Sequence, residues 1–171
     1  KKTLSETEIK PADTKTIKAL YYTTLADMYL KQKMYAESID PLTKSLDYLS
    51  GKSAKYRTKY LLAQLYERSG DSQKATRLYR EVVNMNPTYE VEFNARINIA
   101  GVFDVNSGKP AEIARELEKM LKDSKNKEYL DQIYFALGNM MMKEGKEKEA
   151  IGYYRKSASS ASENMNQKGK S

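Results

Sequence analysis

Residues 59–87 read KYLLAQLYERSGDSQKATRLYREVVNMNP and contain two helical patterns with a turn signal between them. Apolar or small residues recur there at three- and four-residue spacing, which gives each helix one apolar face. These positions are Leu62, Ala63, Tyr66, Ala75, Tyr79 and Val82. Gly70 is expected to end the first helix in a left-handed conformation, and Asp71 to cap the second. Pro87 stops the second helix after Met85, so the segment predicts a helix–turn–helix unit.

The same pattern of aromatic, apolar and small residues recurs three more times along the chain. The other copies contain Tyr22, Leu25, Ala26 and Tyr29; Ile97, Ala100 and Gly101; and Tyr134, Leu137, Gly138 and Met141. The third copy in chain order is the weakest, because Asp104 stands where an aromatic ring is expected. The turns give the period independently, since Gly108 follows Gly70 by 38 residues and Gly145 follows Gly108 by 37. Lys33 takes the turn position of the first copy.

This period and residue pattern match the tetratricopeptide repeat, a hairpin of two helices. The sequence therefore predicts an all-α fold, a TPR-type right-handed α-α superhelix (solenoid) of about four helix–turn–helix repeats. Residues 1–171 form one domain in this prediction, with repeats at approximately residues 19–55, 56–93, 94–130 and 131–167. The expected helices cover approximately residues 13–32, 36–49, 54–69, 72–85, 88–106, 110–122, 127–144 and 147–160. Small residues should let the two helices of each unit approach closely, and these are Ala26, Ala63, Gly101 and Gly138.

Proline and glycine positions give further expectations about helix ends. Pro110 fits the first position of its helix. Gly51 is expected to stop one helix, with Ser53 capping the next. Pro41 lies inside a predicted helix and should either kink it or move its start toward Ser38.

The ends of the chain suggest a piece of a longer protein. The sequence starts at Lys1 without Met, and no stretch approaches the length of apolar residues that a membrane span needs. Residues 1–10 are expected to be the frayed end of a preceding unit, and residues 163–171 the entry to a further helix. Membrane contact is expected only through an anchor outside this fragment.

The composition excludes several kinds of catalytic chemistry. The chain has no Cys and no His, which excludes disulfides, Cys nucleophiles, Cys or His zinc sites and His general bases. Residues 51–53 (Gly-Lys-Ser) resemble part of a phosphate-binding loop, but Leu46 stands where the motif needs its first glycine. Carboxylate pairs such as Glu147 and Glu149 point apart on a helix. We therefore expect no enzymatic activity, no catalytic residue, no metal site and no cofactor.

The charge pattern favours a protein or peptide partner over nucleic acid. The formal charge is +7, from 30 Lys and Arg against 23 Asp and Glu. A basic balance can indicate nucleic-acid binding, but here the two signs are interleaved along the whole chain rather than gathered in a basic patch. Nucleic-acid binding is therefore kept only as a remote alternative.

The repeat register places a second set of residues on the first-helix face that lines the concave groove of such a solenoid. Amide and aromatic groups there can hold the backbone of an extended peptide. The candidate partner-binding residues are Thr23, Asp27, Tyr60, Gln64, Asn98, Phe135, Asn139 and Met142. The alternative is that these side chains are simply solvated. By the same register, Met141 is a core residue.

Several segments resemble one family within the tetratricopeptide proteins. They are residues 60–66, 93–98, 119–123, 126–134 and 167–168. Together they resemble the SprE/PorW family of outer-membrane tetratricopeptide lipoproteins, from about residue 18 to 168. That family is associated with gliding motility and type IX secretion in the Bacteroidetes. The resemblance implies a periplasmic, outer-membrane-associated protein that links components of a secretion machine, with its lipid-attachment Cys outside this chain.

These observations favour a non-enzymatic protein–protein interaction scaffold of the bacterial cell envelope, as a component of secretion or gliding machinery. Two alternatives remain open. One is a structural, self-assembling solenoid segment of a larger periplasmic protein, because the open ends of a solenoid expose apolar faces. The other is the remote nucleic-acid-binding repeat domain. The sequence does not name the partner.

Overall fold

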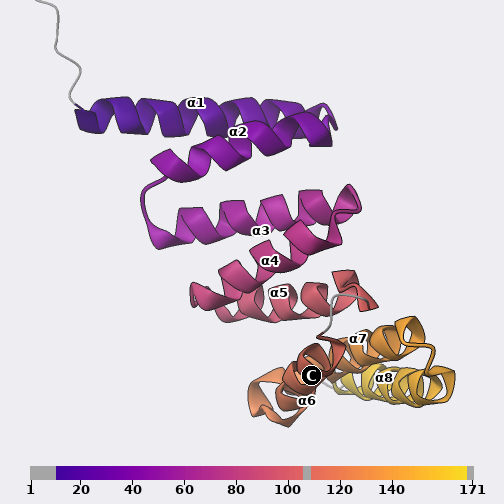
Figure 1. The fold of residues 1–171 in the computed structure, drawn as a ribbon. Helices are drawn as coiled ribbons and strands as arrows, with labels where there is room; N and C mark the ends of the chain where they lie inside the picture. Colours follow the sequence, from indigo (N-terminus) through magenta and orange to yellow (C-terminus); the bar gives the residue numbers. More distant parts are fainter. Residues whose placement is uncertain (1–10, 106–108, 169–171) are drawn as a thin grey trace, which may run out of the picture.

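The computed structural model describes residues 11–105 and 109–168, and these form a chain of helices (Figure 1). The helices are α1 (Pro11–Lys31), α2 (Tyr35–Tyr48), α3 (Lys52–Arg68), α4 (Ser72–Asn84), α5 (Tyr89–Val102), α6 (Pro110–Lys122), the short 3₁₀ helix η2 (Ser124–Tyr129), α7 (Leu130–Lys143) and α8 (Glu147–Lys168). No strand occurs within these two ranges. The all-α prediction is confirmed.

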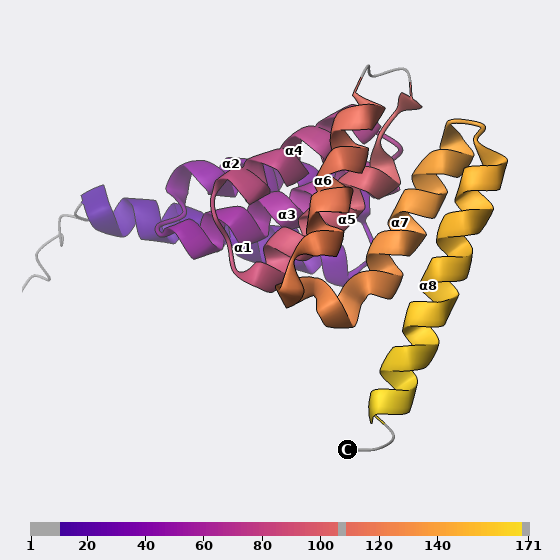
Figure 2. The ribbon, with the colours of Figure 1, turned by 90° about the horizontal axis from the view of Figure 1, so that it is seen from below.

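Consecutive helices pack as hairpins that stack into an elongated array. The pairs α1 with α2, α3 with α4 and α7 with α8 share the most extensive contacts, and α4 also packs closely on α5. Figure 1 shows α1 to α5 stacked one below another, with α7 and α8 at the far end of the array. The third unit differs, because α5 packs more extensively against α7 than against α6. In Figure 2, α7 and α8 again run side by side.

The turns between paired helices follow the predicted chemistry. Gly70 and Gly145 have φ angles of 82° and 74°, in the left-handed region that glycine adopts without steric cost. Lys33 holds the equivalent turn with a φ of 60°. The Asp71 carboxylate accepts a hydrogen bond from the Lys74 backbone N–H at 3.0 Å and so caps α4. The predicted cap is confirmed, whereas Gly108 lies outside the described residues.

One expectation about helix ends is wrong, and one of the two alternatives for Pro41 is excluded. Ser53 does not cap α3, because Gly51 with a φ of 84° is the residue that precedes the helix and Ser53 lies inside it. Pro41 is accommodated inside α2, which starts at Tyr35 rather than near Ser38. Pro41 has no backbone N–H, so α2 lacks one backbone hydrogen bond at this position. The Pro41 side chain is buried.

The last two helices also differ from the prediction. The expected helix over residues 127–144 divides into η2 and α7. The buried Asn126 lies within η2, where its amide donates to the Met120 carbonyl oxygen at 2.7 Å and its side-chain oxygen accepts from the Tyr89 hydroxyl at 2.5 Å. Helix α8 continues without a break to Lys168, so no separate helix begins at residue 163. The expectation about residues 1–10 lies outside the described part of the chain.

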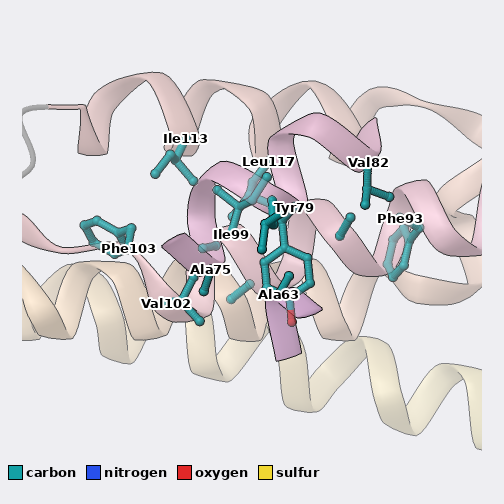
Figure 3. Packing of buried hydrophobic residues seen from close by; sticks show 14 of the residues in the cluster. Ala63, Ala75, Tyr79, Val82, Phe93, Ile99, Val102, Phe103, Ile113 and Leu117 are labelled. Atoms are coloured by element: carbon teal, nitrogen blue, oxygen red, sulfur yellow. The ribbon is translucent and has the colours of Figure 1, made fainter. Parts of the chain in front are cut away.

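The core follows the repeat register. Its largest fully buried apolar side chains are Leu62, Tyr79, Val82, Ile99, Leu117, Ile133, Leu137 and Met140. Figure 3 shows Tyr79 of α4 between residues of the neighbouring helices, including Ala63 and Ile99. Met141 is buried as well, which confirms its predicted core position.

Small residues sit at the helix contacts in three of the four units. Ala26 and Ala63 are fully buried, and Gly138 is buried against α8. Gly101 is the exception, since it is exposed and a Cβ added to it would meet no other atom within 4 Å. The prediction of a close helix approach at Gly101 is therefore wrong. The reason is that α5 packs more extensively against α7 than against α6, its partner in the third unit.

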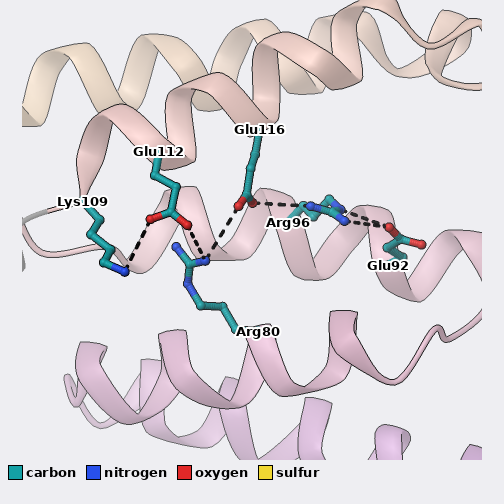
Figure 4. Close-up of polar contacts among 6 residues, drawn as sticks. All are labelled: Arg80, Glu92, Arg96, Lys109, Glu112 and Glu116. Carbon is teal, nitrogen blue, oxygen red and sulfur yellow. Dashed lines mark hydrogen bonds and ion pairs between the residues drawn. The ribbon is translucent and has the colours of Figure 1, made fainter.

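An ion-pair network links α4, α5 and α6 in this looser third unit (Figure 4). Glu116 of α6 stands between Arg96 of α5 at 3.4 Å and Arg80 of α4 at 3.7 Å. Arg96 also pairs with Glu92 at 2.9 Å, and Arg80 pairs with Glu112 at 3.5 Å. Polar bridges thus supplement the apolar contact between α5 and α6.

Candidate protein-binding groove

A cleft of about 390 Å³ lies where the first helices of three successive units face one another. Its lining residues come from α3, α5 and α7, with one residue from α8. They are Glu67, Ile97, Asn98, Gly101, Asp131, Gln132, Phe135, Ala136, Asn139 and Ser157. We call this cleft the central groove. Since first helices line it, it occupies the face on which the repeat register places partner-binding residues.

Three of the predicted partner-binding residues meet in the central groove. Phe135 is 53% exposed, which is high for a large apolar side chain and leaves its ring available for contact. Asn98 and Asn139 contribute amide groups to the same lining. The Asn139 side-chain oxygen accepts a hydrogen bond from the Tyr154 hydroxyl at 2.9 Å, which leaves its N–H groups for another acceptor.

Asn98 is the centre of a polar chain beside the groove. Its side-chain N–H groups donate to the hydroxyls of Tyr60 at 3.0 Å and Tyr79 at 3.1 Å. The Tyr79 hydroxyl in turn donates to the Glu67 carboxylate at 2.8 Å. Burial, together with the hydrogen bond to Glu67, raises the pKa of Tyr79 far above its ordinary range. Asn98 is therefore fixed in position, and Tyr79 stays a neutral donor.

Tyr60 is more deeply placed than a solvated groove residue would be. Its side chain is half-buried, and its ring packs edge-on against Tyr79 with centroids 5.4 Å apart. Burial raises the pKa of the Tyr60 hydroxyl. Tyr60 does not line the central groove, so the structure assigns it a supporting contact with Asn98 and Tyr79 rather than an open surface.

The other predicted residues do not line the central groove. Gln64 is exposed on α3, and Met142 is 45% exposed near the end of α7. Thr23 donates its hydroxyl to the backbone oxygen of Ala19 at 2.8 Å, inside its own helix. Asp27 pairs with Lys31 at 2.7 Å on the solvent side of α1. A binding role for these four residues stays a prediction.

The repeat register did not indicate four polar residues of the groove, namely Glu67, Asp131, Gln132 and Ser157. A signal for two of them existed, because Asp131 and Gln132 precede Phe135 by four and three residues and so share its helix face. Glu67 and Ser157 were less accessible to prediction. Their place in the lining depends on how α3 and α8 sit against α5 and α7, which the repeat pattern alone does not fix.

A second cleft, of about 530 Å³, lies between α5, α6 and η2. Its charged lining contains Glu92, Arg96, Glu116, Lys119, Asp123 and Lys125, three acids and three bases. Arg96 is already held by two carboxylates, and Tyr89 by Asn126. This cleft is larger, but its central groups satisfy one another, so the central groove is the better candidate for binding.

The described residues offer no arrangement typical of a metal site, since no group of three or more Asp or Glu side chains there could hold an ion. Across residues 11–105 and 109–168, no helix has both the length and the apolar character that crossing a bilayer requires.

The helix hairpins, the turn glycines and the groove are those of a repeat solenoid, and comparison with known proteins agrees. A family model described as tetratricopeptide repeat matches residues 56–89 and 131–164. Two segments of this chain thus match the tetratricopeptide-repeat model. Such repeats are in general non-catalytic scaffolds for protein–protein interaction. A search of curated proteins finds no match.

Solved structures with this fold extend the similarity to nearly the whole chain. A crystal structure of MamA superposes with a TM-score of 0.62 at 16% identity, covering 94% of this chain and 99% of that one. The tetratricopeptide-like repeats of a putative kinesin light chain from Podosopora anserina give a TM-score of 0.67 at 16% identity, covering 93% and 80%. At such identity the likeness concerns the fold alone, and it confirms the predicted tetratricopeptide superhelix. The repeat bounds and the resemblance to the SprE/PorW family stay predictions.

Proposed function

We propose that this chain is a protein-binding scaffold whose central groove holds an extended segment of a partner protein. The observation that carries the proposal is the composition of the groove. It combines an exposed aromatic ring, Phe135, with amide groups from the two helices α5 and α7 in one cleft of about 390 Å³. Amides can bond to both the N–H and C=O groups of a peptide backbone, and the ring supplies apolar contact area.

The fold supports this proposal because it presents the groove rigidly. The Asn98 side chain is held by its hydrogen bonds to Tyr60 and Tyr79, and the Asn139 side chain by its hydrogen bond from Tyr154. A preorganised surface loses little conformational entropy when a partner binds.

An affinity pull-down tests the groove. The bait is wild type or the double variant Phe135→Ala/Gln132→Ala, since both side chains are exposed and no hydrogen bond in the described structure depends on them. The matched control is Ile151→Ala/Lys148→Ala on α8, where Ile151 is 50% exposed and neither residue lines the groove. We expect the control to retain proteins that the groove variant loses. Equal recovery by all three baits would overturn the groove as the binding surface.

We further propose that the scaffold works in the bacterial cell envelope, on the periplasmic side of the outer membrane, as a component of secretion or gliding machinery. The support is the resemblance of five segments to the SprE/PorW family. Fractionation of the source organism with an antibody against this chain is the test. Recovery with outer membranes and release by detergent are expected, and recovery in the cytosol would contradict the proposal.

A second candidate role is end-to-end assembly of the solenoid, and the face of α1 favours it. Tyr21 and Met28 are 59% and 43% exposed, although their repeat equivalents Ile133 and Met140 in α7 are fully buried. Leu20 beside them is 66% exposed. This apolar stripe has the pattern of a face that another helix covers. Light scattering over a range of concentrations should show association that Leu20→Ser/Tyr21→Ser abolishes, and a wild-type monomer at every concentration would dismiss this role.

A further inference from the structure

The ionisable groups that line the central groove are both acids, and we propose that the groove selects a basic side chain, Arg in preference to Lys, from the bound segment. This inference rests on the proposed function, because it adds a specificity to the same groove. Its physical basis is the position of Glu67 on α3 and Asp131 on α7, which line one cleft together with the exposed ring of Phe135.

The sign of the charge in the groove is opposite to that of the chain. Lys and Arg outnumber Asp and Glu by 30 to 23 overall, yet neither Lys nor Arg lines the groove. Glu67 and Asp131 give the lining a formal charge of −2, counted from those two side chains. A local negative potential on a basic protein attracts a cationic group and disfavours an acidic one.

Asp131 has an acceptor that the folded chain leaves unused. Its Oδ1 atom is buried and has no hydrogen-bond partner, and no ion pair to Asp131 occurs among the described residues. The Ser157 hydroxyl reaches only the Asp131 backbone oxygen, at 2.8 Å. A buried carboxylate oxygen without a donor is costly, so a ligand that supplies an N–H group would relieve that cost.

Glu67 also has one carboxylate oxygen that is not engaged by Tyr79. Its Oε2 atom accepts the Tyr79 hydroxyl at 2.8 Å, and within residues 11–105 and 109–168 it forms no ion pair. The Tyr79 hydroxyl fixes the orientation of the carboxylate, and the second oxygen remains for a donor from a ligand. Carboxylate acceptors in a fixed orientation suit the planar fork of a guanidinium, which can bond through two N–H groups at once.

A lysine that contacts the groove residue Gly101 is engaged with the end of α5. Lys143 contacts the carbonyl oxygens of Gly101 and Phe103 at the end of α5, and its ammonium lies 5.1 Å from the Phe103 ring centroid. It therefore neutralises the C-terminal end of α5 rather than the groove carboxylates. The exposed Phe135 ring adds a surface on which a guanidinium can stack.

Selection from a phage library of random linear peptides tests the inference. Wild type is compared with Glu67→Gln/Asp131→Asn, which keeps the shape of both side chains and removes their charge. The control Glu90→Gln/Asp47→Asn makes the same change in net charge at two exposed acids that do not line the groove. All three proteins are first shown to be folded at the temperature of the selection.

We expect wild type and the control to enrich peptides with a central basic residue, Arg more often than Lys, and the groove variant to lose that preference. A selected peptide should bind the groove variant about tenfold more weakly or worse, which corresponds to about 1.4 kcal/mol. Replacing the Arg of this peptide by citrulline should weaken its binding to wild type by a similar factor and its binding to the groove variant only slightly.

The outcomes separate this inference from the proposed function. Enrichment of peptides without a basic residue, with binding lost in Phe135→Ala, would overturn the charge selection and leave the groove as a peptide site. A failure of wild type to enrich any peptide would overturn both. Equal weakening by the control variant would show a general charge effect and dismiss the role of Glu67 and Asp131.

Discussion

Tyr154 of α8 packs its ring directly onto Gly138 of α7. A Cβ built on Gly138 would stand 2.5 Å from Cε1 and 2.7 Å from Cδ1 of that ring, closer than real Cβ atoms approach. The ring has little freedom to withdraw, because its hydroxyl donates to Asn139 and its centroid lies 5.7 Å from the centroid of the Phe135 ring. The glycine therefore sets the distance between α7 and α8.

Gly138→Ala should destabilise the fold by about 1–3 kcal/mol, the cost of forcing an added methyl into a packed site. The better helix propensity of alanine, worth about 1 kcal/mol, offsets part of that cost. Urea unfolding measures the change. Gly101→Ala is the matched control, because its Cβ would meet no atom and the fold should gain up to about 1 kcal/mol. The same sign at both positions would contradict the close packing at Gly138.

The loss of stability when a side chain is truncated to alanine should increase with the burial of that side chain. Tyr79→Ala and Leu137→Ala each remove a fully buried side chain and should cost about 2–5 kcal/mol. Tyr60→Ala should cost less, about 1–2 kcal/mol, because the half-buried ring loses its edge-on contact with Tyr79 and the hydrogen bond from Asn98. Chemical denaturation of the three variants gives the order. A loss at Tyr60 as large as that at Tyr79 would mean that Tyr60 is a core residue.

Alkaline conditions should weaken the fold through Tyr79. Burial and Glu67 raise its pKa in the folded chain, so the unfolded chain loses this proton at a lower pH than the folded one. The stabilisation is complete below the ordinary tyrosine pKa of about 10 and is lost progressively as the pH rises above it. Melting temperatures between about pH 8 and pH 11 measure the decline.

Tyr79→Phe is the control for that pH dependence. It keeps the ring and removes the titrating hydroxyl, so its melting temperature should fall less steeply with pH than that of wild type. The slope should not vanish, because burial also raises the pKa of Tyr60, Tyr89 and Tyr153. An unchanged slope would show that Tyr79 does not contribute to the alkaline loss of stability.

Glu116→Gln should loosen the third unit, since Glu116 is the only carboxylate that contacts both Arg80 and Arg96 among the described ion pairs. The three side chains are about one third exposed or less, and a pair in such a network is worth about 0.5–1 kcal/mol. Thermal unfolding should show the loss at low salt and a smaller one at high salt. Glu118→Gln on the same helix changes the charge equally without an ion pair in the described structure, and an equal loss there would rule out the network as the cause.

The sequence predicted the helices and their order because repeat chemistry is local. The period of apolar residues, the turn glycines at Gly70 and Gly145, and the cap at Asp71 each depend on a few neighbouring residues. The errors arose where contacts between residues far apart in the sequence determine how the helices pack. Gly101 fits the small-residue position of the repeat, yet α5 packs more extensively on α7 than on α6, and a Cβ added to Gly101 would meet no atom within 4 Å.

The candidate groove could be predicted in part for the same reason. The register placed Asn98, Phe135 and Asn139 on first helices, and these residues do line one cleft. It also gave Tyr60 a place on that face, but the ring turns toward Tyr79 and becomes half-buried. Sequence spacing gives the face of a helix on which a side chain starts, whereas its final exposure depends on the helix that packs over it.

The sequence by itself determined that this chain is a solenoid of helix hairpins, because a helix face and a glycine turn need only short-range interactions. Only the tertiary structure decided that Glu67 and Asp131, 64 residues apart, line the same cleft. The physical reason is that the angle between successive hairpins depends on many small contacts at their interfaces. That angle decides which side chains share the groove.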